Sequence, residues 1–438
     1  MKTINSIALC AVSLAMMACA QAQESNSFIS DSRTSIRYSQ IYWDENHANG
    51  VGPTRDEWVQ AALFSFNSGW YENLLGLDYS YGVADALDVG NKATSISNLE
   101  AGHTVQSPHG IAKPVEAYLR GHLVGEAGEV NVGVGKKSRR YALYFDDPVS
   151  RILPPSTLGA DVDYRIGGLN ARYSYINGFS ARNESGWADD MTNFSGEKVD
   201  ALRLYALSYS FGDGTRILTE YAESEDDLKE YSIKVERSFQ LATNQFLDLY
   251  ATHGSQQDAG KLFDYHAVPG VYEAESSHDA RYIDLSAKYR IGHMYTGVNY
   301  NKVSGDDFDR LFFAADHGTW NSSAKLFYYF GLEDEEMFRV FAGTDFDFIG
   351  VPQLRFDSHY AFSNHAAGYD GFSRREFQSV LQYNFTGVLK GLGMAWLHNE
   401  FHTKGTPDQV TRFATSYGPA GIITHHANRF YLNYVYNF

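Results

Sequence analysis

Long hydrophobic runs, cysteine and proline are all scarce in this chain of 438 residues. After the N-terminus no segment approaches the about 20 consecutive apolar residues that a helix needs to cross a membrane, which excludes a bundle of such helices. Aromatic residues, by contrast, make up 15% of the chain, with 31 Tyr and 28 Phe. Together with a mean hydropathy of -0.36, this composition fits either several soluble domains or one large β-barrel whose strands are apolar on one face.

Residues 1–22 have the order of segments that is typical of a secretory signal peptide. Lys2 supplies positive charge, Ile7–Met17 forms an apolar core, and small residues follow, so cleavage is expected after Ala20 or Ala22. Lipidation of Cys19 is the alternative. The only other cysteine, Cys10, is also removed on cleavage, which leaves a mature chain, residues 23–438, without disulfides or thiolate chemistry.

The charge of the chain is strongly negative. It is formally -17, and becomes -18 when Lys2, the one charged residue of the signal peptide, is removed. Proteins that bind nucleic acid neutralise phosphates with Lys and Arg, so nucleic acid is excluded as a partner. An excess of acidic residues instead keeps long surface loops solvated.

A strand of about 10 residues followed by a turn repeats from Thr34 to the end of the chain, with no linker between domains. The pattern is clearest in Asn428–Phe438. On one face lie Phe430, Leu432, Tyr434, Tyr436 and Phe438. On the other lie Arg429, Asn433 and Asn437.

The segment Arg281–Ile291 shows what kind of sheet this is. Ile283, Leu285 and Tyr289 share one face, but the other face carries Asp284, Ser286, Lys288 and Arg290. A sheet packed in a soluble sandwich would bury such charges, whereas the lumen of a wide barrel keeps them hydrated. The sequence therefore predicts a single all-β domain, a transmembrane antiparallel barrel with the apolar face toward lipid.

Further runs of this kind cover much of the chain: Glu116–Leu123, Leu169–Asn177, Asp227–Phe239, Phe246–His253, Met337–Phe348, Leu354–Phe362 and Phe377–Phe385. All candidates together number roughly 19, but a bacterial single-chain barrel needs an even number, which favours about 18. The weakest candidate is Gly159–Ile166.

The connections and the C-terminus suggest an orientation. Tight turns at 212–214 and 291–293 suit the periplasmic side, and the acidic stretches 223–227 and 333–336 suit long outer loops. Phe438 fits the aromatic last residue that commonly closes an outer-membrane barrel. We expect it to be read by the outer-membrane assembly machinery.

Short motifs along the mature chain resemble those of the OprD family of substrate-selective porins of Gram-negative bacteria. In the N-terminal part they are Glu57-Trp58-Val59-Gln60, Ser68-Gly69-Trp70 and Leu75-Gly76-Leu77-Asp78. The most specific is Arg151-Ile152-Leu153-Pro154-Pro155-Ser156-Thr157-Leu158-Gly159, which is similar to an Arg-Leu-Leu-Pro segment of that family. Further on come Gly350-Val351-Pro352-Gln353-Leu354, Glu376, Tyr383 and Lys390-Gly391-Leu392, with Gln353 in place of a family glycine.

This resemblance implies a monomeric outer-membrane barrel of about 18 strands, narrowed by loops that fold inward and lined by a ladder of basic residues. By strand parity the basic residues expected in the lumen are Arg120, Arg172, Lys288, Arg290, Arg339, Arg355 and Arg429. The acidic residues expected to face them are Asp78, Asp284, Asp345, Asp347 and Asp357. The alternative is that these charges only form ion pairs on a wet wall.

The segment Lys136–Leu158 is the strongest candidate for a constriction. It carries the basic residues Lys136, Lys137, Arg139 and Arg140, followed by Asp146 and Asp147. Opposed charges across a narrow gap create a transverse field that orients dipolar solutes, so we expect the two sets to face each other. An ordinary solvated outer loop is the alternative.

Catalytic and cofactor-binding patterns are not convincing. Gly135-Lys136-Lys137-Ser138 lacks the leading glycine of a phosphate loop, and no Gly-x-Ser-x-Gly element is present. His398 and His402 would lie some 13 Å apart on one strand, too far to bind one metal. His425-His426 is interpreted as a loop pair. The sequence thus favours a channel without cofactor or metal over an adhesin or a barrel enzyme.

The expected function is passive, substrate-selective diffusion of small polar solutes and ions into the periplasm. The basic lining favours small carboxylates such as amino acids or organic acids, because guanidinium groups bind carboxylates in bidentate fashion. A channel for sugars such as chitooligosaccharides is the alternative, since the chain is rich in aromatic residues. The remaining expected partners are outer-membrane lipid and lipopolysaccharide.

Overall fold

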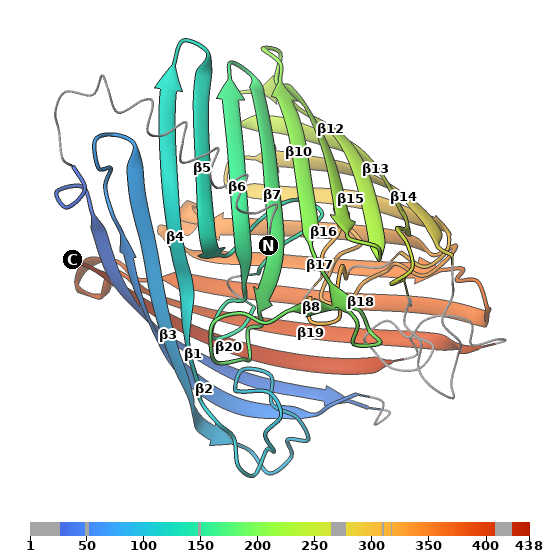
Figure 1. Ribbon diagram of the computed structural model, residues 1–438. Helices are drawn as coiled ribbons and strands as arrows, with labels where there is room; N and C mark the ends of the chain where they lie inside the picture. The colour runs from blue at the N-terminus through green and yellow to red at the C-terminus, as the bar shows by residue number, and fades with distance from the viewer. Residues whose placement is uncertain are drawn as a thin grey trace.

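The computed structural model describes residues 27–48, 52–147, 150–263, 277–308, 311–316, 318–407 and 423–438, so the expected signal peptide lies outside the described residues. Its main element is a closed antiparallel barrel of 18 strands. β20 (Thr424–Asn437) pairs with β1 (Arg33–His47), and this pairing closes the barrel, as the red and blue ribbons show in Figure 1. No helix in the described part of the chain is long and apolar enough to cross a membrane.

The other barrel strands are β2 (Arg55–Asn67), β3 (Leu75–Val89), β4 (Ile111–Gly125), β5 (Gly128–Lys137), β6 (Ser156–Ile166), β7 (Leu169–Ser180), β10 (Leu202–Ser210), β11 (Thr215–Ser224), β12 (Leu228–Ala242), β13 (Gln245–Asp258), β14 (Asp279–Ile291), β15 (Met294–Gly305), β16 (Glu336–Phe346), β17 (Val351–Asn364), β18 (Tyr369–Asn384) and β19 (Leu392–Pro407). The short strands β8 (Met191–Thr192) and β9 (Lys198–Val199) pair with each other in the connection between β7 and β10. Two 3-10 turns, η1 (Asp347–Ile349) and η2 (Gly387–Leu389), lie between long strands.

The alternation that the sequence predicted is present in the strands. On β14, Ile283 and Leu285 are 51% and 43% exposed, whereas Tyr282 and Asp284 are 1% and 0% exposed. Every second side chain therefore points outward to the apolar surface, and the polar ones point into the barrel. The predicted fold class, an all-β barrel of about 18 strands, is confirmed.

Three details differ from the sequence-based expectations. The run Gly159–Ile166, singled out as the weakest, belongs to β6 and is a full wall strand. The acidic stretch 223–227 is not a long loop, because β11 ends at Ser224 and β12 starts at Leu228. Asp347 is not on the lumen wall, since the strand ends at Phe346 and η1 begins there.

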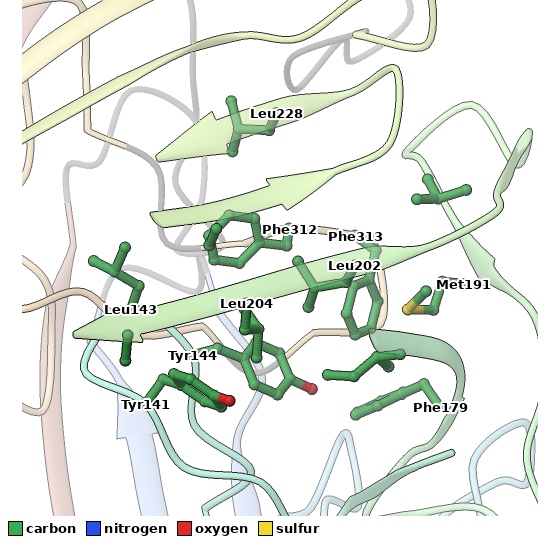
Figure 2. Close-up of a cluster of buried hydrophobic side chains, with 14 of the residues drawn as sticks. Tyr141, Leu143, Tyr144, Phe179, Met191, Leu202, Leu204, Leu228, Phe312 and Phe313 are labelled. Carbon is green, nitrogen blue, oxygen red and sulfur yellow. The ribbon is translucent and has the colours of Figure 1, made fainter. Parts of the chain in front are cut away.

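The connections at the two ends of the barrel differ in length. At the end that carries Phe438 they are short, as between β14 and β15, which suits the periplasmic side. At the other end, the connections 90–110, 138–155 and 306–335 are long. Parts of all three pack against the inner wall, and Figure 2 shows one of the resulting apolar clusters.

The cluster in Figure 2 joins two of these loops to the wall. Tyr144 comes from loop 138–155, Phe312 and Phe313 come from loop 306–335, and Leu202 and Leu204 come from β10. Each of these side chains is at most 1% exposed. Burial of aromatic and aliphatic surface at about 25 cal/mol per Å² holds the loops inside the barrel.

Candidate functional site

Four buried carboxylates of the wall hold the inserted loops by binding the backbone of those loops. Each accepts hydrogen bonds from loop N–H groups, as Glu376 does from Phe327 N at 3.1 Å and Tyr328 N at 2.9 Å. Bonds of this kind are strengthened by the charge of the acceptor. The four are Glu57 for loop 90–110, Glu220 for loop 138–155, and Asp284 and Glu376 for loop 306–335.

Between loops 138–155 and 306–335 and the wall lies a cavity of about 660 Å³, large enough for a small organic solute. The basic residues of its lining are Arg140, Arg172, Arg216, Lys234, Lys288, Lys325 and Arg339. The acidic residues are Glu220, Glu236 and Asp284. Seven basic against three acidic side chains give the lining a positive balance of four, although the whole chain is strongly acidic.

All three acidic residues of the lining already have partners. Glu236 forms ion pairs with Arg216 at 3.0 Å and Lys234 at 3.3 Å. Asp284 accepts hydrogen bonds from Ser323 and from the hydroxyl of Tyr250, and Glu220 holds a loop N–H. The three carboxylates of the lining therefore already bind other groups of the protein.

Three cations of the lining have no ion pair within the described part of the chain: Arg140, Lys288 and Arg339. They lie instead over aromatic rings. Arg140 is 4.7 Å from the ring centre of Phe145, and Lys288 is 4.4 Å from that of Tyr295. Cation–π contacts orient a cation but do not neutralise it, so these groups remain able to bind an anion.

The expected arrangement of opposed charges in the segment Lys136–Leu158 is not formed. Lys137 and Arg139 pair with Asp161 of the wall, at 3.2 and 2.8 Å, and do not face Asp146 across a gap. Asp146 is buried and accepts hydrogen bonds from Arg139 N and Tyr144 Oη. These contacts form because a loop inside a barrel must satisfy its own polar groups first.

Burial raises the pKa of Asp146 to about 6. Lys136 is also buried and donates to the carbonyl of Trp187, and Asp147 accepts from Ser150 N, so neither faces the cavity lining. Of the six charges expected at the constriction, Arg140 lines the cavity and the other five do not.

Of the residues expected on the lumen wall, Arg172, Lys288, Arg339 and Asp284 line the cavity. The other expected basic residues lie on the wall outside its lining, each beside a carboxylate. Arg120 pairs with Asp78, Arg290 with Asp248, Arg355 with Asp357 and Arg429 with Glu45. Asp345, at the end of β16, pairs with His293.

Three cations of the cavity lining were not predicted from the sequence: Arg216, Lys234 and Lys325. Lys234 lies within the predicted run Asp227–Phe239 on the same face as Glu236, so strand parity could have identified it. Arg216 lies in β11, which is not among the runs named from the sequence. Lys325 is on a loop, where periodicity carries no signal.

A closed barrel with a polar lumen, narrowed from one end by loops anchored to its inner wall, defines a membrane channel. The family model "outer membrane porin, OprD family" matches residues 26–417, and the chain belongs to this family. The protein is therefore an outer-membrane porin, a transport channel and not an enzyme. No curated protein matches the sequence.

Solved structures with the same fold come from Pseudomonas aeruginosa. OpdK, crystallised with vanillate, has 18% sequence identity and a TM-score of 0.75 over 94% of this chain and 100% of that chain. OccK9 (OpdG) gives a TM-score of 0.78 with 18% identity over the same shares. OpdO gives 0.73 with 19% identity, over 94% of this chain and 99% of that chain.

Proposed function

We propose that this porin passes small organic carboxylates by passive diffusion. The observation that supports this most is the charge of the cavity lining, where basic residues outnumber acidic ones by seven to three. Because Arg140, Lys288 and Arg339 have no ion pair in the described part of the chain, an incoming carboxylate meets these three cations without a competing wall carboxylate. The vanillate in the OpdK structure is itself a small aromatic carboxylate.

A relay of cations suits diffusion better than a single strong site. Arg172, Lys234, Lys288 and Arg339 come from four different wall strands, β7, β12, β14 and β16, and so offer successive contacts around the cavity. Guanidinium groups bind a carboxylate through two parallel hydrogen bonds, and a lysine binds it as a point charge. A solute that is passed between several moderate sites enters readily and leaves again.

The same lining disfavours the two other substrate classes. Sugars need free aromatic faces, but Phe145 lies near both Arg140 and Lys325, at 4.7 and 5.2 Å, and Trp320 is only 3% exposed. Amino acids need an acceptor for the ammonium group. Glu236 already binds Arg216 and Lys234, so organic acids without an ammonium group are favoured.

Liposome swelling tests the proposal. Proteoliposomes would be exposed to benzoate-like acids, to amino acids and to neutral sugars of similar size, and the organic acids should enter fastest. The double variant Arg140→Gln with Lys288→Gln should lose this preference. Arg281→Gln is the matched control, because this residue is on β14 like Lys288 but its side chain is 57% exposed on the outer face. Equal entry of all three solute classes into wild-type liposomes would refute the proposal.

We also propose that residues 1–22 are removed as a signal peptide and that the assembly machinery reads the C-terminus. The exposed ring of Phe438 packs edge-on against Tyr436, and its N–H donates to Thr34 O at 3.0 Å. Deletion of Phe438 should lower the amount of folded, heat-modifiable barrel in the outer membrane. An unchanged amount would contradict this role.

A further inference from the structure

A second group of polar side chains lies on the outer face of strands β19 and β20. From their spacing along one strand, His398 and His402 are too far apart to bind one metal, and His426 was predicted to lie in a loop. That placement was wrong, because β20 starts at Thr424. In the register of the two strands, His426 lies opposite Glu400, and Asn428 lies opposite His398. Pairing across strands thus brings together histidines that the spacing along one strand keeps apart.

The geometry of this group matches that of a metal site. One ligand atom each from His398, Glu400 and His426 lies within 4.8 Å of the others. The two imidazole centres are 5.1 Å apart, with their planes at 71°. Two imidazoles on one tetrahedral Zn²⁺ ion have centres roughly 5 Å apart, because each nitrogen lies about 2 Å from the ion. The rings therefore already stand at the separation that a shared ion needs.

Asn428 orients the first of these ligands. Its Oδ1 lies 3.1 Å from Nδ1 of His398 and also accepts a hydrogen bond from Trp396 Nε1 at 3.2 Å. An Nδ1–H that donates to this oxygen leaves the lone pair on Nε2, the atom that lies 3.5 Å from Glu400 Oε1. A hydrogen bond to the far ring nitrogen is the usual way in which proteins fix the tautomer of a metal-binding histidine. The same amide donates through its Nδ2 to Nε2 of His426 at 3.0 Å, and a metal ion on that nitrogen would take the place of this bond.

Charge around this group favours a cation. Asp44 of β1 lies opposite Asn428, and Asp56 of β2 lies opposite Asp44, on the same outer face. Carboxylates on the two neighbouring strands of the same face lower the electrostatic energy of a divalent ion.

Two other groups of the described chain bring a carboxylate and two histidines as close together, but both are less suited. In Glu45, His47 and His425 the carboxylate is bound by Arg55 at 2.5 Å, and Arg429 lies at 3.4 Å, so two positive charges oppose a metal ion. In the third group, Glu100, His103 and His109, the rings stack with centres 3.6 Å apart, and they would have to separate before binding one ion.

We propose that His398, Glu400 and His426 form a binding site for Zn²⁺ or a similar divalent transition metal on the outer rim of the barrel. A carboxylate with two imidazoles is a ligand set that zinc uses when it keeps a fourth position open, and here that position faces outward, to an oxygen ligand from solvent or membrane. The ion would clamp β19 to β20 above the ring of Trp396. The site is separate from the channel lumen and does not depend on the transported substrate.

The test is isothermal titration of ZnCl₂ into detergent-solubilised protein without a polyhistidine tag. The starting protein carries His103→Ala and His109→Ala, so that the group of Glu100, His103 and His109 cannot contribute to the measured Zn²⁺ stoichiometry. One equivalent of Zn²⁺ should bind. Because Zn²⁺ binds the folded barrel, the unfolding temperature should rise as the Zn²⁺ concentration is raised above the Kd. Loss of His426 (His426→Ala) should abolish both effects. Asn428→Ala should weaken binding by about 10–100-fold, as expected for a residue that orients a ligand.

Two comparisons keep the test decisive. His402→Ala changes a histidine of the same strand and outer face that is outside the group, and Zn²⁺ binding should be unchanged. With Co²⁺ in place of Zn²⁺, intense visible absorption indicates tetrahedral coordination and should disappear in His398→Ala. Zn²⁺ binding that survives both His398→Ala and His426→Ala would overturn the proposal, as would the absence of binding in the starting protein.

Discussion

Arg139 and Arg140 are neighbours in the chain, yet they have opposite surroundings. Arg139 is 2% exposed, and its guanidinium donates to both oxygens of Asp161, at 2.9 and 2.8 Å, and to Thr157. Arg140 lines the cavity, is exposed, and rests over the ring of Phe145. The first arginine fastens the loop to the wall, and the second is available to a solute.

This difference separates the segment 137–155 into two sets of residues, the anchored arm (Lys137, Arg139 and Asp146) and the cavity-facing arm (Arg140, Tyr141 and Phe145). Charge alone does not distinguish the two, since each contains an arginine. What distinguishes them is whether a carboxylate of the wall lies within reach. Buried ion pairs hold structure at the expense of binding, whereas an unpaired cation in a narrow, wet cavity attracts anions.

The largest expected effect is on stability, from Asp161→Ala. This change leaves Arg139 buried without its partner, and we expect a loss of about 3–5 kcal/mol in the free energy of unfolding. Arg140→Ala, which removes no ion pair, should stay within about 0.5 kcal/mol of wild type. Urea unfolding in lipid bilayers measures both. A loss as large for Arg140→Ala would erase the distinction between the arms.

The same comparison of neighbours can be made on a wall strand. Leu285 is 43% exposed on the outer face, and Ser286 lines the cavity. Leu285→Arg places a charge toward lipid and should cost about 2–4 kcal/mol of stability, while Ser286→Arg should mainly change conductance. The two variants would be compared by unfolding and by single-channel recording. Equal destabilisation would mean that the register of β14 is wrong.

A smaller effect depends on pH and concerns the anchored arm. Burial raises the pKa of Asp146 from 3.8 to about 6, so the folded protein favours the protonated acid. Stability from this group is therefore fully present below pH 3.8 and is lost as pH rises through about 6. The loss is at most about 3 kcal/mol. Asp146→Asn should remove this part of the pH dependence when unfolding is compared at pH 4.5 and 7.5, and an unaltered profile would contradict the assignment.

The smallest expected effect is a shift in ion selectivity. Arg140→Gln combined with Lys288→Gln removes two unpaired cations and should move the reversal potential toward cation preference. Lys137→Gln, on the anchored arm, should change it less, because Lys137 is already paired with Asp161. Raising salt from about 0.1 M to about 1 M should shrink the wild-type preference, since the Debye length falls from about 10 Å to about 3 Å. If Lys137→Gln shifts the reversal potential more than the double variant does, the constriction lies at the anchored arm and not at the cavity-facing arm.

Much of the fold follows from the sequence because strand periodicity is local. The alternation in Arg281–Ile291 gave the outward face of β14 directly, and the requirement for an even number of strands led to the observed count. The run Gly159–Ile166 was the weakest candidate because it could belong partly to the loop before it. It pairs with β5 and β7 along its full length, and partners on both sides compensate for weak propensity.

The site was harder to predict, because it depends on contacts between distant segments. Parity identified Lys288 and Arg339, but it could not tell that Asp161 would take up Lys137 and Arg139 from another strand and a loop. The closeness of His398 to His426 was not predicted for the same reason, since it depends on the register between two strands. Sequence gives the face of a residue, and only the assembled barrel gives its neighbour.

The four wall carboxylates that hold the inserted loops all accept hydrogen bonds from backbone N–H groups of those loops, as Glu57 does from Ser97 and Asn98. A backbone anchor is indifferent to the side chain beside it. Loop residues that face the lumen can therefore be exchanged during evolution, or in the laboratory, while the loop keeps its position. The barrel thus serves as a constant frame in which new permeation properties can arise by single substitutions, without a new fold for each solute.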